Sequence, residues 1–270
     1  MRSSRAQPSS EVIDRQRLPA HIGGMRRAWL VGVACWAIVG ATSPVAADPS
    51  TPNWEKRRRL MLEHQLVGRD IVDKKVLDAM GTVPRHLFVP EGIRARAYED
   101  RPLPIGQSQT ISQPYIVAFM TQAVGLRGGE KVLEVGTGSG YQAAVLGAIV
   151  DRVYSIEILE RLAQQGQANL AAAGVRNVTV RVGDGYRGWP EEAPFDAIVV
   201  TAAPDHVPQP LVEQLKPGGR LVIPVGGGDV QRILVVRRTA EGSTTKAVLP
   251  VRFVPMTGEA QRRSANPSGR

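Results

Sequence analysis

Two polar segments contain the residues of this chain that could do chemistry. The first, residues 106–115 (GQSQTISQPY), is rich in hydroxyl and amide side chains. The second, residues 134–141 (EVGTGSGY), follows an apolar run and has a glycine at every second position. Glycines at such a turn let a ligand approach the backbone closely. The sequence therefore predicts a nucleotide-like cofactor at the second segment, with a hydroxyl-bearing segment nearby.

The glycine spacing separates one cofactor class from another. A dinucleotide-binding fingerprint needs its third glycine at position 141, where this chain has Tyr141. The glycines are instead Gly136, Gly138 and Gly140, and they follow Glu134. This order resembles the acidic-x-Gly-x-Gly-x-Gly loop of S-adenosylmethionine-dependent methyltransferases. The departure at position 141 argues against NAD and favours S-adenosyl-L-methionine.

Two acidic residues stand where further strands are expected to end. Glu157 closes the run Arg152–Glu157, and Asp184 follows the run Val178–Val182. In a doubly wound sheet, ligands bind beyond the carboxyl ends of the strands. A carboxylate at position 157 can accept both hydroxyl protons of a ribose. The methyltransferase pattern implies that Asp184 accepts from the adenine amino group. Either acid taken alone is equally consistent with a cap at a strand end or with a solvated loop.

The order of predicted elements defines the fold that would position these residues. From Gln113 onward, strands alternate with helix-length segments, which implies right-handed βαβ units on a parallel sheet. Two last strand-like runs have no helix between them and predict an antiparallel pair. The expected fold class is therefore α/β, a doubly wound, mostly parallel sheet of the class I S-adenosylmethionine-dependent methyltransferase (Rossmann-like) type. The expected strands are Lys131–Val135, Arg152–Glu157, Val178–Val182, Asp196–Thr201, Arg220–Val225, Arg232–Arg238 and Val248–Val254, and the helices are Tyr141–Ile149, Leu159–Ala173 and Pro208–Leu215.

Extra helices are expected before the sheet. Residues 54–69 have the spacing of an amphipathic helix. A second helix is expected to begin with Asp73 as its N-cap and to end at Gly81. Prolines bound residues 83–90, which we expect to be extended. Pro114 suits the first turn of the next helix, so an ordinary N-cap is the alternative to a chemical role for Ser112.

Longer stretches resemble the protein-L-isoaspartate O-methyltransferase family. The most specific is residues 103–114 (LPIGQSQTISQP), and further matches occur at residues 83–89, 195–204, 224–226 and 251–255. The resemblance covers residues 55–257. It implies transfer of a methyl group from S-adenosyl-L-methionine to the free carboxylate of L-isoaspartyl and D-aspartyl residues in damaged proteins, leaving S-adenosyl-L-homocysteine. It also implies Ser112 as the catalytic-site serine. The cofactor-binding residues expected are Thr110, Ile111, Glu134, Gly136, Thr137, Gly138, Ser139, Gly140, Glu157, Asp184 and Gly185.

Other chemistries have less support in the residues. Methyltransferases that act on planar amino groups usually have an Asn/Asp-Pro-Pro-aromatic motif where this chain has Thr201-Ala202-Ala203-Pro204. The four histidines lack the spacing of metal ligands, so no metal is expected. Because a fold does not determine a substrate, the alternative is another O-methyltransferase of this fold, acting on a small molecule or another protein carboxylate.

The ends of the chain differ in character from its middle. Residues 1–24 are polar and unpatterned, whereas residues 25–47 combine two arginines, an uncharged apolar stretch and a small-residue exit, as in a cleavable signal peptide. We expect a single methyltransferase domain over residues 48–257 and disorder over 1–24 and 258–270. The expected location is the periplasm; the alternative is the cytoplasm, as for ordinary family members.

The charge and composition bear on the partners of the chain. The net charge is +9, but aromatic residues make up only 5% of the chain and are not interleaved with basic runs. This leaves no stacking platform for single-stranded nucleic acid. We expect age-damaged isoaspartyl proteins and peptides as partners, with no nucleic acid. A monomer without stable membrane association after cleavage is also expected.

Overall fold

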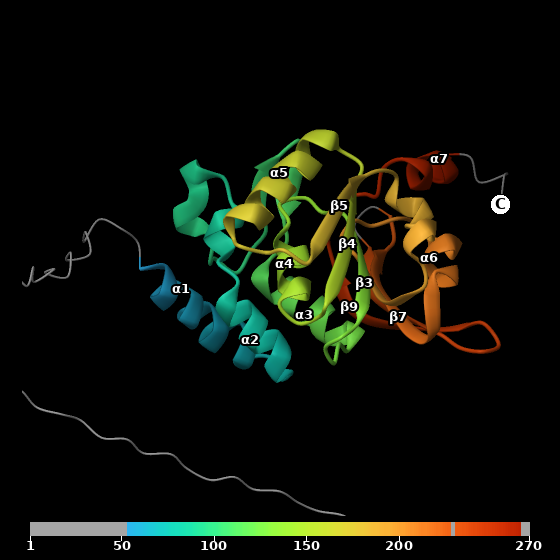
Figure 1. The fold of residues 1–270 in the computed structure, drawn as a ribbon, viewed down its shortest axis with the longest axis horizontal. Helices are drawn as coiled ribbons and strands as arrows, with labels where there is room; N and C mark the ends of the chain where they lie inside the picture. The colour runs from blue at the N-terminus through green and yellow to red at the C-terminus, as the bar shows by residue number, and fades with distance from the viewer. Residues whose placement is uncertain (1–52, 228–229, 266–270) are drawn as a thin grey trace, which may run out of the picture. The chain divides into compact units, whose positions relative to one another are not determined.

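The computed structural model describes residues 53–227 and 230–265 (Figure 1). The predicted N-terminal extension and signal segment, residues 1–47, lie outside the described residues. Within the described part of the chain, no helix combines the length and the apolar character that crossing a bilayer would require.

A seven-stranded sheet in the order β5-β4-β3-β6-β7-β8-β9 organises the fold. In this order the strands from β5 through β7 pair in parallel. Strand β8 pairs antiparallel with β7, and β9 pairs antiparallel with β8. The predicted mostly parallel sheet with an antiparallel C-terminal pair is therefore confirmed. The strands are β3 (Lys131–Val135), β4 (Arg152–Glu157), β5 (Val178–Val182), β6 (Phe195–Val200), β7 (Leu215–Val225), β8 (Gln231–Arg238) and β9 (Ser243–Val251).

The central strands β3, β4 and β6 are mostly buried because helices cover both faces of the sheet. Figure 1 shows α3, α4 and α5 on one side of the strands and α6 and α7 on the other. Consecutive residues of β3 enter opposite cores: Val132 packs in the larger cluster and Leu133 in the smaller. The strand order reverses between β3 and β6, so the carboxyl ends of these two strands flank the crevice in which ligands bind in such sheets.

The helices around the sheet follow the predicted order, with shorter ends. They are α3 (Pro114–Val124), α4 (Tyr141–Gly147), α5 (Glu160–Ala172) and α6 (Gln209–Glu213). Helix α3 begins at the predicted proline, but its N-cap is Gln113 and no side chain caps it. The placement of Ser112 in the N-cap region is therefore wrong by one residue.

The segment before the sheet differs from the prediction in two places. Helix α1 (Trp54–Met61) continues as a π-helical turn, η1 (Leu62–Val67), so residues 68–69 are not helical. Helix α2 (Lys74–Thr82) is capped by Asp73 as predicted and ends one residue past Gly81. The expected extended segment at residues 83–90 instead contains a 3-10 helix, η2 (Arg85–Phe88), whose first residue is anchored by long-range hydrogen bonds.

The β1–β2 hairpin and the C-terminal helix were not predicted. Strands β1 (Leu103–Gly106) and β2 (Gln109–Ile111) form a hairpin whose two turn residues both have positive φ. Neither is the Asn or Gly typical of such turns, so the sequence signal for a hairpin is weak.

The prediction of disorder over residues 258–270 is wrong for residues 259–265, which form helix α7 (Glu259–Ala265). The first N–H of α7 donates to Asp184 at 2.7 Å, a contact between residues 75 positions apart. The remaining 3-10 turns are η3 (Glu91–Arg96), η4 (Gly185–Arg187) and η5 (Pro190–Glu192).

Candidate active site

The glycine segment forms the turn between β3 and α4. Gly136, Gly138 and Gly140 have φ values of +101°, +51° and +87°, in the left-handed region that side chains disfavour. Space is restricted as well: a Cβ on Gly136 would lie 2.3 Å from the Thr201 hydroxyl oxygen, and one on Gly140 would lie 3.0 Å from the Gly166 carbonyl oxygen. Both backbone conformation and packing therefore require glycine here, as the spacing predicted.

A pocket of about 270 Å³ opens over this turn. Among the described residues that line it, Glu157 is the single charged side chain, and none is Lys or Arg. Such a pocket suits a ligand that has hydroxyl groups but no phosphate. We call it the cofactor pocket; it is lined by Gln107, Gln109, Thr110, Val135, Gly136, Gly138, Ile156, Glu157, Ile158, Leu159, Leu162, Gly185, Thr201, Ala202, Val254, Pro255, Met256 and Thr257.

Glu157 is held at the wall of the cofactor pocket by two backbone groups. Its Oε2 accepts a hydrogen bond from the Gly138 N–H at 2.8 Å, and its Oε1 accepts from the Leu159 N–H at 3.0 Å. The residue is 6% exposed. Each carboxylate oxygen can accept a second hydrogen bond, so the group is preorganised to receive two hydroxyl protons. This geometry supports the ribose-binding role predicted for Glu157.

Glu134 lies beneath the glycine turn and lines neither the cofactor pocket nor the neighbouring cavities. It is fully buried, and this burial raises its pKa to about 8. The Ser155 hydroxyl donates to Glu134 Oε2, and the hydroxyl oxygens of Ser155 and Thr137 are 2.5 Å apart. Glu134 Oε1 has no hydrogen-bond partner among the described residues. In this structure the residue supports the turn from below.

Asp184 uses its carboxylate within the protein. Oδ1 accepts from the Tyr186 N–H at 3.0 Å and Oδ2 from the Glu259 N–H at 2.7 Å, so Asp184 caps both η4 and α7. It does not line the cofactor pocket, whereas Gly185 does. A Cβ at position 185 would lie 2.2 Å from Val135 Cγ1. The structure thus shows the capping role for Asp184, and its contact with adenine stays a prediction.

A second cavity, also of about 270 Å³, adjoins the cofactor pocket, and Thr110 and Thr201 line both. We call it the acceptor cavity; it is lined by Pro102, Thr110, Ser112, Gln113, Ile116, Thr201, Pro250, Val251, Arg252, Phe253 and Val254. The Ser112 hydroxyl forms no hydrogen bond with any residue in the described ranges, and it does not cap α3. It is therefore free to bind a ligand in this cavity.

A smaller cavity, of about 40 Å³, lies between the two segments that the sequence singled out. It brings together Thr110, Ile111 and Ser112 from the first segment with residues of the glycine turn. The predicted site residues in its lining are Thr110, Ile111, Ser112, Gly136, Thr137, Gly138 and Ser139. The structure thus gathers most of the predicted site, and Gly140 stands behind it as the N-cap of α4.

The sequence did not reveal some of the residues that line the site. The Thr201 hydroxyl is near the carbonyl oxygens of Gly136 and Val135, at 2.8 and 3.1 Å, and ties β6 to the glycine turn. Its position at the end of a predicted strand was the available signal. Residues 254–257 reach the cofactor pocket because Ala203 exchanges backbone hydrogen bonds with Val254 and Met256. No local pattern announces that contact.

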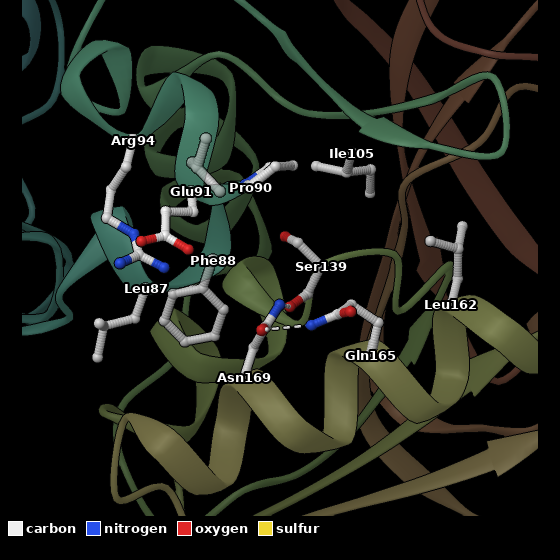
Figure 2. Close-up of a pocket in the computed structure, with 11 residues that line it drawn as sticks. Leu87, Phe88, Pro90, Glu91, Arg94, Ile105, Ser139, Leu162, Gln165 and Asn169 are labelled. Atoms are coloured by element: carbon white, nitrogen blue, oxygen red, sulfur yellow. Dashed lines mark hydrogen bonds between the residues drawn. The ribbon is translucent and has the colours of Figure 1, made fainter.

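A further hollow, of about 230 Å³, lies on the outer side of the glycine turn (Figure 2). It is formed by residues of η2 and η3 facing Leu162, Gln165 and Asn169 of α5. Asn169 donates to the Ser139 carbonyl oxygen at 2.9 Å, and Gln165 donates to Asn169 at 2.9 Å. Ser139 is the single predicted site residue in its lining. The side chains of Gln165 and Asn169 therefore support the glycine turn from this side, and we assign the cofactor to the cofactor pocket on the opposite side of the turn.

No group of three His, Cys, Asp or Glu suited to a metal ion occurs among the described residues.

Comparisons with known proteins place these features in a family. A family model described as protein-L-isoaspartate(D-aspartate) O-methyltransferase matches residues 56–261. A protein-L-isoaspartate O-methyltransferase from Opitutus terrae is 55% identical over 234 residues, covering 86% of this chain and 99% of that one. A relative of the same name from Synechococcus is 56% identical over 220 residues, covering 79% and 88%.

Solved structures have the same fold. One protein-L-isoaspartate O-methyltransferase structure has a TM-score of 0.68 at 29% identity, covering 78% of this chain and 69% of that one. A Plasmodium falciparum structure, in complex with S-adenosyl-L-homocysteine, has a TM-score of 0.64 at 22% identity, covering 77% and 99%. The similarity therefore extends over nearly all of the described residues.

Proposed function

Because this chain belongs to the protein-L-isoaspartate(D-aspartate) O-methyltransferase family, it is an S-adenosylmethionine-dependent enzyme that methylates isoaspartyl carboxylates in damaged proteins, and we propose how its residues do so. The two adjoining cavities are the observation from which we assign a role to each residue. Among the described residues, the lining of one has a single carboxylate and no basic side chain, and the lining of the other includes the Ser112 hydroxyl, which has no hydrogen-bond partner there.

The cofactor pocket holds S-adenosyl-L-methionine, whose sulfonium supplies the methyl group. Glu157 accepts hydrogen bonds from the two ribose hydroxyls, because its oxygens are already fixed by backbone N–H groups. The glycine turn allows close approach of the ligand to the backbone, since no Cβ projects from positions 136, 138 and 140. The absence of Lys and Arg from the described lining suits a cationic ligand without phosphate.

The acceptor cavity holds the isoaspartyl carboxylate. This group is already anionic at neutral pH, so the enzyme needs no general base. The Ser112 hydroxyl donates a hydrogen bond to one carboxylate oxygen and so orients the other toward the methyl group. Thr110 and Thr201 border both cavities and mark where the two ligands meet. Alignment at near-attack distance and removal of water are the contributions left to the protein.

Transfer joins a carboxylate to a methyl group that leaves a sulfonium, so opposite charges are neutralised. A dry site favours such a step over the separated ions, because water stabilises the ions more than it stabilises the neutral products. The product methyl ester has a better leaving group than the free acid. The neighbouring backbone amide nitrogen can then attack the ester carbonyl, release methanol and close a succinimide, whose hydrolysis returns some normal aspartate.

A matched pair of peptides tests the substrate assignment. We expect methylation of a peptide with one L-isoaspartyl residue and none of its L-aspartyl twin, which has the same atoms in a different connectivity. Equal methylation of the two peptides would favour the alternative, an O-methyltransferase that acts on another carboxylate. Methylation of neither would point to a small-molecule acceptor for the same cofactor pocket.

We also propose that the enzyme works in the periplasm as a monomer. The support for this location is the signal-like composition of residues 25–47, with two arginines before an uncharged apolar stretch and small residues at its exit. The alternative is the cytoplasm, where the cofactor is made. Cell fractionation with N-terminal sequencing tests the location, and light scattering of the purified protein tests the monomer.

A further inference from the structure

A buried arginine that contacts the backbone of Ser112 takes part in none of the steps above. Arg85 lies in η2 and is fully buried. Its guanidinium carbon lies 4.7 Å from the ring centroid of Tyr141, the first residue after the glycine turn. Burial lowers its pKa to about 10, so it is still protonated at neutral pH. It forms no ion pair with any carboxylate in the described ranges. A buried cation without such a partner is costly, and its presence calls for a reason.

The hydrogen bonds of Arg85 supply that reason. Its Nε donates to the Ala97 carbonyl oxygen and its Nη2 to the Ser112 carbonyl oxygen, each at 2.7 Å. Ala97 is the C-cap of η3, ahead of β1, and Ser112 directly follows β2, so one side chain ties the end of η3 to the residue that follows the β1–β2 hairpin. Because the guanidinium nitrogens lie in a rigid plane, they fix the two carbonyls relative to each other.

We propose that Arg85 is a positioning residue that sets the direction of the Ser112 hydroxyl by holding the Ser112 carbonyl; the inference rests on the role proposed for Ser112. Ser112 lines the acceptor cavity, whereas Arg85 does not. With its carbonyl directed to Arg85, the backbone of Ser112 is fixed and its side chain can face the cavity. The same bond keeps a carbonyl oxygen from turning toward an anionic acceptor. A second tie, from the Gln113 side chain to the Asp100 carbonyl oxygen at 3.0 Å, holds the next residue.

Lysine cannot reproduce this arrangement. Its single ammonium nitrogen is a flexible point charge, whereas the arginine fork presents two donors at a fixed spacing. The substitution Arg85→Lys therefore keeps the charge but not the simultaneous hold on both carbonyls. The substitution leaves the neighbouring η2 residues Leu87 and Phe88, which line the outer hollow (Figure 2), as they are in the wild type. Charge and positioning can thus be separated by experiment.

The experiment compares Arg85→Lys and Arg85→Gln with a matched control. Asn177→Ala removes a side chain that likewise donates to two backbone carbonyls, those of Gly147 and Val150, at the opposite end of the sheet. For each variant we would measure kcat and KM for an isoaspartyl peptide, the Kd of S-adenosyl-L-homocysteine by calorimetry, and Tm. The calorimetric stoichiometry counts folded sites, so kcat is expressed per folded enzyme.

We expect both Arg85 variants to lower kcat by about 10- to 100-fold, since a small misplacement of a reacting group has effects of this size. The Kd of S-adenosyl-L-homocysteine should stay within about twofold of the wild-type value, because the cofactor pocket does not contain Arg85. Asn177→Ala should lower Tm with kcat unchanged. An Arg85 variant that keeps wild-type kcat, or that no longer binds S-adenosyl-L-homocysteine, would overturn the proposal.

A double-mutant cycle with Ser112→Ala separates this inference from the function on which it rests. Where Arg85 acts through the Ser112 hydroxyl, Arg85→Lys has little further effect on kcat once that hydroxyl is gone. Additive losses would mean that Arg85 acts elsewhere, and the inference would be wrong while the role of Ser112 stands. Full turnover by the single variant Ser112→Ala would instead refute the role of Ser112 and the inference with it.

Discussion

The substitution Glu157→Gln tests the cofactor site most directly. The two carboxylate oxygens accept from the Gly138 and Leu159 N–H groups at 2.8 and 3.0 Å, and we propose that they also accept from both ribose hydroxyls. An amide has one acceptor oxygen, so its NH₂ group must face one of those N–H donors and one ribose hydroxyl. The variant therefore loses both a charge-assisted contact to the ligand and part of the anchor of the glycine turn.

The magnitude follows from the charged hydrogen bond. Losing one contact to an ionised group costs about 1.5–3 kcal/mol. At 1.4 kcal/mol for each tenfold change, this corresponds to a Kd about 10- to 150-fold weaker. The loss should be the same for S-adenosyl-L-methionine and S-adenosyl-L-homocysteine, because the ribose is common to both. Isothermal titration calorimetry with each ligand measures it.

A neighbouring acid provides the control. Glu160, in the first turn of α5, is exposed and does not line the cofactor pocket. Glu160→Gln makes the same chemical change three residues away, and we expect no effect on either Kd. Unchanged affinity of Glu157→Gln for either ligand would remove Glu157 from the ribose-binding role. Loss of S-adenosyl-L-methionine binding alone would place it near the methyl group instead.

Three further outcomes are expected. Ser112→Ala should lower kcat strongly while the Kd of S-adenosyl-L-homocysteine stays near wild type; loss of cofactor binding by a folded variant would assign Ser112 to the cofactor site. Burial raises the pKa of Glu134 to about 8 from 4.5, so the stability that its protonated form contributes is complete below pH 4.5 and is lost as the pH rises to about 8. The free energy of unfolding of the ligand-free wild type should therefore fall across this pH range, by up to several kcal/mol, relative to that of Glu134→Gln. If the unfolding free energies of the two proteins changed with pH in parallel, the argument from burial would be wrong. N-terminal sequencing after fractionation should find a periplasmic protein that begins near Asp48; a cytosolic protein with an intact start at Met1 or Met25 would refute export.

Much of the fold can be read from local patterns. The bounds of β3, β4 and β5 were predicted to the residue, because each is a short run rich in Val, Leu, Ile or Tyr that Gly136, Glu157 or Gly183 ends. The parallel order followed from the helices between them, since a crossover connection is needed to return the chain to the same edge. The glycine turn was predicted for the same local reason, because its positive φ values are available to glycine without strain.

The exceptions are contacts between residues far apart in the chain. Helix α7 has few local signals, and its first turn is capped by a carboxylate 75 positions earlier. The turn of the β1–β2 hairpin has Gln107 and Ser108 at positive φ, which local propensity would not select. The sequence could propose Asp184 as a ligand or as a cap, and only the position of α7 shows that its Oδ2 caps a second helix.

The sequence by itself determined the glycine turn, Glu157 and Ser112, since the local backbone needs of a strand-to-helix turn and the chemistry of each side chain are written in consecutive residues. Only the tertiary structure decided what surrounds them: Thr201 behind the turn, residues 254–257 at the cofactor pocket, and Arg85 beneath Ser112. These contacts join segments 27 to more than 100 residues apart. Their geometry depends on how helices and strands pack once the apolar faces are buried, and no period of 2 or 3.6 residues encodes it.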